Sequence, residues 1–246
     1  MDKPIVQSLW IDIDGNGLSD MEWLSINSFL LNDNEYHLYT YNNPTVPPGT
    51  KLMDANEILP EDQIFTYQVG PGKGSPSAYS NLFRYKLLHE RGNWWVDTDF
   101  VCLRQFVFGL GVVFASETHG GNHITSGVIK APAGWPMFKE LYESVDEMDK
   151  TTLEWGQIGP SLMQYKVIDG KQEKYVAEAK VFCPISWYDA PQKFIEPDPY
   201  TSIADYKSNG TYAIHLWNEM WRRTNTRKNA NHHSDSLYAK LREEYL

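Results

Sequence analysis

The sequence predicts an α/β fold with a mostly parallel central sheet flanked by helices. Strand-like and helix-like segments alternate through the first part of the chain, and this order is typical of parallel strands joined by helices. The chain has 246 residues, which is enough to bury a large core, and no break in composition divides it. In sheets of this kind, ligands bind beyond the carboxyl ends of the strands.

The first half of the chain contains the clearest element signals. The expected elements are a strand over 5–11, a helix over 18–31, strands over 35–41 and 64–67, and a helix over 75–92. Ser19 and Glu22 have the spacing of a capping box at the start of the first helix. Ser75 and Pro76 open the second helix, which carries apolar residues at helical spacing and stops near Gly92.

The second half is less regular, because its apolar runs are short. The expected elements are strands over 112–116, 126–130, 181–186 and 212–217, with helices over 135–148 and 160–167. Together with the first half, these segments complete an alternating α/β pattern.

Charge and composition narrow the classes of function. The 22 basic and 32 acidic residues give a net charge of -10, which argues against nonspecific binding to nucleic acid or to anionic membranes. Cys102 and Cys183 lack metal-ligand spacing and suggest neither a disulfide framework nor a zinc site. No segment approaches the roughly 18 apolar residues of a transmembrane helix. We therefore expect a cytoplasmic protein and leave peripheral attachment to a membrane open.

The most informative stretch is the Asp-Thr-Asp that follows the strand-like run at 94–96. In an extended segment Asp97 and Asp99 would point the same way, about 6 to 7 Å apart. Like charges this close repel, and the repulsion is offset by a cation, a raised pKa or hydration. The preceding helix presents Ser80 and Arg84 on one polar side, four residues apart. A divalent metal is therefore the first hypothesis for this cluster.

These residues resemble a known family. The runs at 80–88 and 92–99 are similar to the DXD region of glycosyltransferase family 32, whose relatives include yeast initiating mannosyltransferases, α-1,4-galactosyltransferases and glucosylating bacterial toxins. The resemblance extends to residues 7–10, 155–160 and 215–218, and covers roughly residues 5–221. Several separated motifs therefore carry it, which an isolated Asp-x-Asp would not.

The resemblance implies a GT-A fold and a metal-dependent, retaining transfer of a hexose to a carbohydrate or glycolipid acceptor. The donor would be a nucleotide sugar, with UDP-hexoses favoured over GDP-mannose, and the cofactor Mn²⁺ or Mg²⁺. It also implies a single catalytic domain over 1–246, with a Rossmann-like nucleotide-binding half at about 1–105 and an acceptor and metal-closing half at about 106–246.

Site roles follow from the resemblance position by position. The donor-binding residues would be Leu9, Trp10, Ser80, Asn81, Arg84, Asp97, Trp217 and Asn218. The metal ligands would be Asp97, Asp99, His215 and Asn218, and the catalytic residues Arg84, Asp97, Asp99 and Gln157. Hard cations prefer carboxylate and phosphate oxygens, so a metal held by Asp99 would neutralise charge on the leaving diphosphate.

Two positions depart from the family, and several residues have a structural alternative. Asn81 stands where Asp is usual, which puts the identity of the donor sugar in doubt, and Asn93 replaces a Gly whose left-handed backbone Asn also tolerates. Structural roles are open for four of the site residues: a core position for Trp10 and His215, an ion pair for Arg84, and a helix cap for Gln157.

A second acidic loop supports an alternative function. Asp12 and Asp14 follow an apolar strand, as in haloacid-dehalogenase phosphatases, where Asp12 would be the nucleophile. A calcium loop begun at Asp12 fails, because its twelfth position is Trp23 where a bidentate Glu is needed. Three hypotheses thus remain: the glycosyltransferase, a catalytically weak sugar- or nucleotide-binding protein of the same fold, and the phosphatase. The sequence singles out no acidic residue as the nucleophile of a transfer that retains the anomeric configuration. Double displacement and a front-face route therefore both remain open.

Overall fold

The computed structural model describes residues 2–118 and 123–246. Its main sheet has seven strands in the order β3-β2-β1-β4-β7-β6-β8, and β7 is antiparallel to both of its neighbours while the other pairings are parallel. The strands are β1 Ile5–Trp10, β2 Glu35–Thr40, β3 Lys51–Asp54, β4 Asn93–Val96, β6 Val113–Ser116, β7 Ile124–Ala131 and β8 Val176–Ala177. The expected mostly parallel sheet is therefore confirmed.

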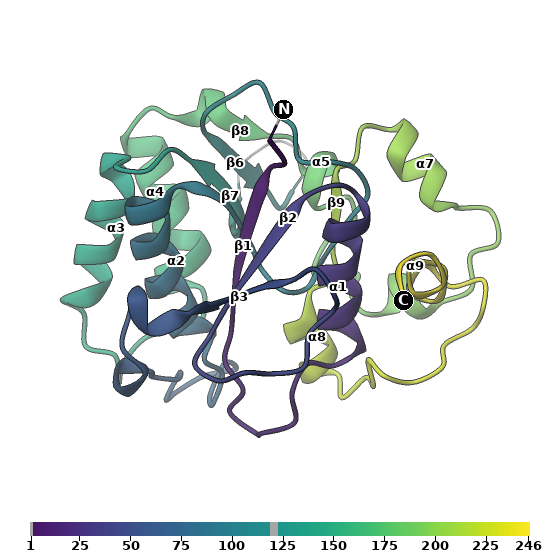
Figure 1. Cartoon of the computed structure of the whole chain (residues 1–246), viewed down its shortest axis with the longest axis horizontal. Coiled ribbons are helices and arrows are strands. Elements are labelled where there is room, and N and C mark those ends of the chain that lie inside the picture. The colour runs from purple at the N-terminus through teal and green to yellow at the C-terminus, as the bar shows by residue number, and fades with distance from the viewer. Residues whose placement is uncertain (1, 119–122) are drawn as a thin grey trace.

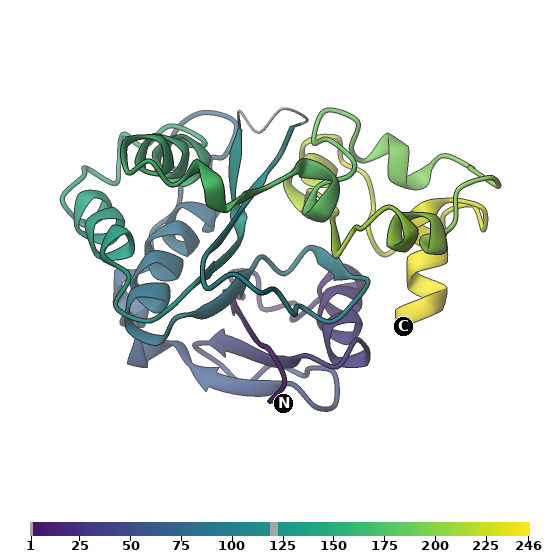
Figure 2. The same cartoon turned by 90° about the horizontal axis from the view of Figure 1, so that it is seen from above.

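Helices cover both faces of this sheet, as Figure 1 shows. The α-helices are α1 Asp20–Leu31, α2 Ser77–Arg91, α3 Pro136–Asp146, α4 Leu162–Asp169, α5 Ala179–Phe182, α6 Gln192–Ile195, α7 Ile203–Ser208, α8 Asn218–Arg223 and α9 Leu237–Tyr245. In Figures 1 and 2, α2, α3 and α4 lie to one side of the sheet, and α1 and the C-terminal helices lie to the other. The result is a three-layered α/β/α arrangement.

The alternation of side chains along the strands divides the core between the two faces. Trp94 and Val96 of β4 pack with α1 and the C-terminal elements, whereas Trp95 packs with α2, α3 and α4. The same alternation separates Tyr36 from Tyr39 on β2. Both faces are thus buried, as expected for the parallel part of an α/β sheet.

A small second sheet joins the Asp-Thr-Asp segment to the end of the chain. Strand β5, Phe100–Cys102, pairs antiparallel with β9, Ala213–His215, and Phe100 is opposite His215. The main-chain N–H of Leu216 donates to the carbonyl oxygen of Asp99 over 2.9 Å. This pairing brings residues 99 and 215–218 together.

The approach to the Asp-Thr-Asp segment depends on two left-handed residues. Gly92 ends α2 with φ 63°, and Asn93 begins β4 with φ 70°. A Cβ at Gly92 would lie 2.3 Å from the main-chain nitrogen of Ala133, so a side chain does not fit there. The expectation that Asn93 tolerates the left-handed conformation is confirmed.

Two predicted strands are wrong. Residues 64–67 join no sheet, because Tyr67 exchanges its main-chain hydrogen bonds with Ser75 and Gly74 across a tight loop. Residues 181–186 begin inside the short helix α5 and continue as a turn, although Phe182 and Cys183 are buried. A short apolar run buries equally well as helix or strand, so its pattern did not distinguish the two.

The predicted helices are confirmed with shifted ends. Ser19 caps α1 with Glu22 in the expected capping box. The helix predicted over 160–167 starts as a π-helical turn, Gln157–Ser161, and continues as α4. The division into halves near residue 105 stays a prediction, and both core clusters draw residues from either side of it. Within the described ranges, no helix has the length and apolar character to cross a membrane.

Candidate functional site

A cleft of about 930 Å³ lies beyond the carboxyl ends of β1 and β4. The predicted site residues that line it are Leu9, Trp10, Ser80, Asn81, Arg84, Asp97, Asp99, His215, Trp217 and Asn218. These residues are far apart in the sequence, yet the fold brings them together at the edge of the sheet where α/β proteins bind ligands.

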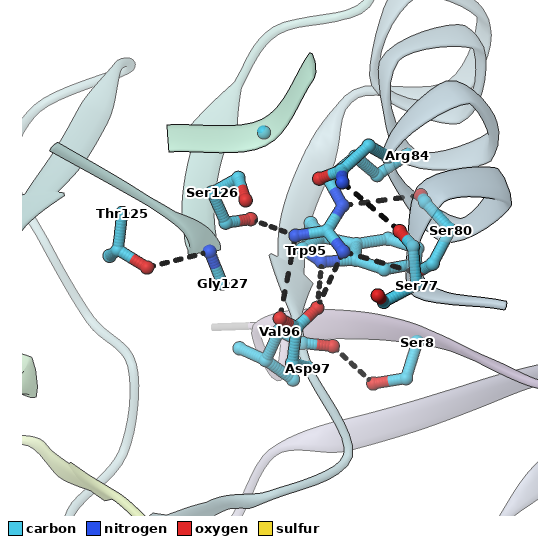
Figure 3. Close-up of polar contacts among 12 residues, drawn as sticks. Ser8, Ser77, Ser80, Arg84, Trp95, Val96, Asp97, Thr125, Ser126 and Gly127 are labelled. Carbon is cyan, nitrogen blue, oxygen red and sulfur yellow. Dashed lines mark hydrogen bonds and ion pairs between the residues drawn. The ribbon is translucent and has the colours of Figure 1, made fainter. Parts of the chain in front are cut away.

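Arg84 is the most constrained side chain in this cleft (Figure 3). Its guanidinium donates to the main-chain oxygen and the hydroxyl of Ser80 over 3.2 and 3.1 Å, and to the main-chain oxygen of Ser126. It also pairs with both carboxylate oxygens of Asp97, with Nη2 3.0 Å from Oδ1, and lies 4.8 Å from the centroid of the Trp95 ring. Hydrogen bonds engage four of the five guanidinium N–H groups. The ion pair with Asp97 that the sequence left open is therefore present.

Asp97 is fixed from three directions. Its Oδ1 accepts from the indole nitrogen of Trp95 over 2.8 Å, and its main-chain nitrogen donates to the carbonyl oxygen of Gly127 over 2.8 Å. A Cβ at Gly127 would lie 3.1 Å from Oδ2 of Asp97 and 2.9 Å from the ring of Phe100, so the glycine allows this close approach. Burial raises the pKa of Asp97, and the positive charge of Arg84 opposes that rise.

Asp99 has one oxygen engaged and one free. Oδ2 accepts from the main-chain nitrogen of Asn218 over 2.8 Å and lies 3.3 Å from Nε2 of His215, whereas Oδ1 is buried and has no hydrogen-bond partner among the described residues. Burial would raise the pKa of Asp99, but His215, the Asn218 N–H and the charge of Lys228 together hold it below its usual value. Asp99 thus combines a charged carboxylate with one oxygen that makes no hydrogen bond to the described part of the chain.

His215 is held between two aromatic rings. Its ring centroid lies 4.1 Å from that of Phe100 and 3.7 Å from that of Trp217. Nδ1 of His215 is buried and has no partner among the described residues. His215 is therefore a core residue whose Nε2 lies beside Asp99 and whose Nδ1 is unused.

The donor set is suited to a divalent cation, although the protein supplies few ligands. Among residues 2–118 and 123–246, no group of three or more His, Cys, Asp and Glu side chains is placed to hold a metal. Oδ1 of Asp99 and Nδ1 of His215 are nevertheless buried ligand atoms without partners. Carboxylate oxygen and imidazole nitrogen fit Mn²⁺, and a diphosphate would provide further oxygens.

Asn81 presents an unused acceptor. The side chain is 5% exposed, its Nδ2 donates to the main-chain oxygen of Ser77 over 3.0 Å, and Oδ1 has no partner. A Cβ at Gly159 would lie 3.0 Å from Oδ1, so the backbone approaches closely here. Leaving a buried acceptor unpaired costs about 1 to 3 kcal/mol, which points to a ligand group in this place.

The aromatic residues of the cleft combine core and surface roles. Trp10 packs partly against the core, and its buried Nε1 has no partner. Leu9 is 7% exposed at the floor of the cleft. Trp217 is 8% exposed, and its Nε1 donates to the carbonyl oxygen of Ile185 over 2.8 Å.

Two predicted residues lie apart from this constellation. Gln157 is exposed and outside the cleft lining, and its Oε1 accepts from the main-chain nitrogen of Glu154 over 2.9 Å, as a capping residue would. Asp12 borders the cleft, but its two oxygens accept from the main-chain nitrogens of Asn16 and Gly17 over 3.1 and 3.0 Å. Asp12 thus organises its own loop.

Three cleft residues were missed in the sequence. Glu117 follows the carboxyl end of β6, a position that could have revealed it. Lys228 lies in the polar C-terminal segment, where it pairs with the buried Glu22 over 2.7 Å and contacts Oδ1 of Asn218 over 3.2 Å. Trp187 directly follows residues 181–186, which were wrongly predicted as a strand, and no sequence pattern singled it out.

Comparisons with known proteins show which proteins this chain is similar to. Residues 141–245 match the family model described as the alpha 1,4-glycosyltransferase conserved region. No curated protein matches the chain. The matched region includes the predicted residues at 157 and 215–218, whereas the Asp97 to Asp99 segment lies outside it.

Solved glycosyltransferases share the fold. The PaToxG glycosyltransferase superposes with a TM-score of 0.52 at 11% identity, over 98% of this chain and 87% of that one. The apo form of the glycosyltransferase GlyE from Streptococcus pneumoniae TIGR4 gives a TM-score of 0.50 at 11% identity, over 100% of this chain and 63% of GlyE. This chain thus spans less than two thirds of GlyE. Residues 141–245 are thus similar to the alpha 1,4-glycosyltransferase conserved region, and the chain shares the GT-A fold of these solved glycosyltransferases.

Proposed function

We propose that the protein is a metal-dependent, retaining glycosyltransferase that moves a hexose from a nucleoside-diphosphate sugar to a glycan acceptor. The observation that supports it best is the half-used carboxylate of Asp99, with Oδ2 fixed by Asn218 and His215 and Oδ1 buried without a partner. UDP-hexoses are favoured over GDP-mannose through the family resemblance.

The cation would lie on Oδ1 of Asp99, and His215, whose Nε2 faces Oδ2 over 3.3 Å, would hold the carboxylate in place. Bound there, Mn²⁺ or Mg²⁺ would neutralise charge on the leaving diphosphate. Lys228 lines the same cleft beside Asn218 and would add a positive charge from the protein. The low pKa of Asp99 keeps its carboxylate charged at neutral pH.

The donor would lie along the floor of the cleft between Trp10 and α2. Trp10 is suited to stack on the base, and its unpartnered Nε1 can donate to the ligand. Four of the five guanidinium N–H groups of Arg84 donate within the protein, so it would act mainly as a positioning residue that orients Asp97 and Ser80 toward sugar or ribose hydroxyls. Oδ1 of Asn81 would accept a further hydroxyl.

Hydrolysis of the donor in the absence of an acceptor tests this proposal. We expect wild type to hydrolyse UDP-glucose, UDP-galactose or GDP-mannose when Mn²⁺ is added, and Asp99→Asn to lose about 100-fold or more of that rate. Asp33→Asn changes an exposed carboxylate in a surface ion pair and is the matched control. Full activity of Asp99→Asn would contradict the metal assignment. The anomeric configuration of a transfer product, measured by NMR, tests retention.

A binding protein of the same fold is the second candidate, because Asn81 lacks the charge that the family usually has. Asn81→Asp places a carboxylate beside Gly159 in a site that is 5% exposed. If wild type binds a nucleotide sugar but does not turn it over, and Asn81→Asp restores turnover, this second candidate is correct. An active wild type whose donor preference changes in Asn81→Asp supports the enzyme.

The phosphatase hypothesis receives less support from the geometry. Its nucleophile, Asp12, has each carboxylate oxygen bound to a main-chain N–H of its own loop. Magnesium-dependent hydrolysis of p-nitrophenyl phosphate that Asp12→Asn abolishes would be required to revive it.

A further inference from the structure

An exposed tryptophan stands in the wall of the cleft. Trp187 is 43% exposed, whereas Cys183 and Ile185, just before it in the chain, are 2% and 6% exposed. It is one of the residues that line the cleft. A single exposed aromatic ring is common on protein surfaces, but one that lines a cleft offers its flat apolar face to whatever binds there.

The segment that carries Trp187 is held firmly. The indole nitrogen of Trp217 donates to the carbonyl oxygen of Ile185 over 2.8 Å. Turn hydrogen bonds follow on the other side, from Asp189 to the carbonyl oxygen of Ser186 over 3.1 Å and from Ala190 to that of Trp187 over 3.3 Å. The exposure of the ring is therefore a property of an ordered turn, and the ring is pre-organised for a ligand.

A carboxylate lines the same cleft as this ring. Glu117 follows the carboxyl end of β6 and lines the cleft together with Trp187. Burial raises the pKa of Glu117 against the opposing attraction of His215. The cleft thus combines a flat apolar ring with a carboxylate that can accept hydrogen bonds.

We propose that Trp187 and Glu117 line the subsite for the acceptor, and that the acceptor group bound there is an uncharged sugar ring. A flat indole face matches the apolar face of a sugar, and a carboxylate matches its hydroxyl groups. The carboxylate of Glu117 and the net charge of -10 disfavour an anionic acceptor. This inference rests on the proposed function and names the class of its second substrate.

The chain provides a matched pair of aromatic residues for the test. Trp187 and Tyr188 are adjacent and their rings are 5.7 Å apart, but Tyr188 is 67% exposed and lies outside the cleft lining. Trp187→Leu removes the flat ring and keeps an apolar side chain. Trp187→Tyr keeps an aromatic ring, and Tyr188→Leu is the control for a general loss of exposed aromatic surface.

Binding is measured by saturation-transfer NMR with methyl glucoside, methyl galactoside, methyl mannoside, lactose, maltose and cellobiose, each with Mg²⁺ and either UDP or GDP. We expect at least one sugar to bind wild type, Trp187→Leu to weaken that binding about tenfold or more, and Trp187→Tyr and Tyr188→Leu to retain it. The subsite is wrong if wild type binds none of these sugars, or if Trp187→Leu binds them as wild type does.

Nucleotide binding by calorimetry on the same samples separates this subsite from the proposed function. Trp187→Leu should bind UDP or GDP as wild type does, because Trp187 belongs to the acceptor side. Loss of sugar binding together with an equal loss of nucleotide binding would contradict an acceptor subsite. Failure of wild type to bind or hydrolyse any donor would instead contradict the glycosyltransferase proposal, whatever the sugars do.

Discussion

The main-chain N–H of Asn218 donates to Oδ2 of Asp99 over 2.8 Å and so links residues that are 119 positions apart. Trp217, just before it, has φ 59°, a left-handed conformation that turns the chain into the start of α8. The side-chain oxygen of Asn218 points elsewhere and accepts from Nζ of Lys228 over 3.2 Å. Asn218 therefore supports Asp99 through its backbone.

This relationship predicts that Asn218→Ala keeps most of the metal dependence. The variant retains the N–H that fixes Asp99. Its apparent affinity for Mn²⁺ in donor hydrolysis should therefore stay within about threefold of that of wild type. Asp99→Asn, by contrast, is expected to lose about 100-fold of the hydrolysis rate. If Asn218→Ala and Asp99→Asn are equally impaired, the side chain of Asn218 is a metal ligand, as the sequence resemblance implied.

A buried ion pair fastens the C-terminal segment to α1. Glu22 is fully buried, accepts from the main-chain nitrogen of Ser19 over 2.7 Å, and lies 2.7 Å from Nζ of Lys228. Lys228→Met leaves that carboxylate without its cation, and we expect unfolding in urea to show a loss of about 2 kcal/mol. Glu22→Gln combined with Lys228→Met should cost less than the sum of the single changes. Additive costs would show that the two charges do not interact.

The parts of the site that the sequence predicted are local in the chain. The capping box of Ser19 and Glu22, the left-handed Asn93 and the position of Asp97 after β4 each depend on residues a few positions apart. Side-chain chemistry and backbone preferences decide such features, so a single sequence contains them.

The parts that could not be predicted depend on long-range packing. Lys228 meets Glu22 across 206 residues, and no local pattern specifies that partner. Arg84 was expected to contact the donor, but four of its five N–H groups donate within the protein, and one of these contacts depends on the placement of Ser126 beside it. Trp187 lies on a turn that is fixed by a hydrogen bond from the indole nitrogen of Trp217 to the carbonyl oxygen of Ile185.

The rim of the cleft is closed by contacts between α8 and two loops. Arg222 donates to the carbonyl oxygen of Pro71 over 2.9 Å, and the Arg223 guanidinium lies 4.6 Å from the centroid of the Trp155 ring. The ring of Trp155 packs on Tyr67, with centroids 5.2 Å apart. These contacts join α8 to residues 67–75 across the mouth of the cleft.

Removing both arginines should loosen the loop without unfolding the protein. For Arg222→Ala combined with Arg223→Ala we expect faster amide hydrogen exchange over residues 67–75, and a change in the free energy of unfolding of only about 0.5 to 1 kcal/mol, because exposed pairs contribute little. Arg91→Ala breaks a surface pair with Glu57 and is the control. Unchanged exchange in residues 67–75 would show that the rim contacts do not hold the loop.

Glu117 predicts an unusual dependence of stability on pH. Burial raises its pKa above the ordinary value of 4.5, so the folded protein binds this proton more tightly than the unfolded chain does. The free energy of unfolding therefore falls as the pH rises from that ordinary value through the higher folded-state pKa, and the destabilisation persists at neutral pH.

Glu117→Gln removes the carboxylate, so its melting temperature relative to wild type should rise between about pH 4 and neutral pH. Thermal unfolding across this range measures the difference, with Glu147→Gln, at an exposed helix end, as the control for loss of one negative charge. If the difference in melting temperature between Glu117→Gln and wild type is the same at every pH, Glu117 is not desolvated in the folded protein. The expected rise would instead show that this carboxylate is kept in the cleft wall at a cost in stability, as functional sites often require.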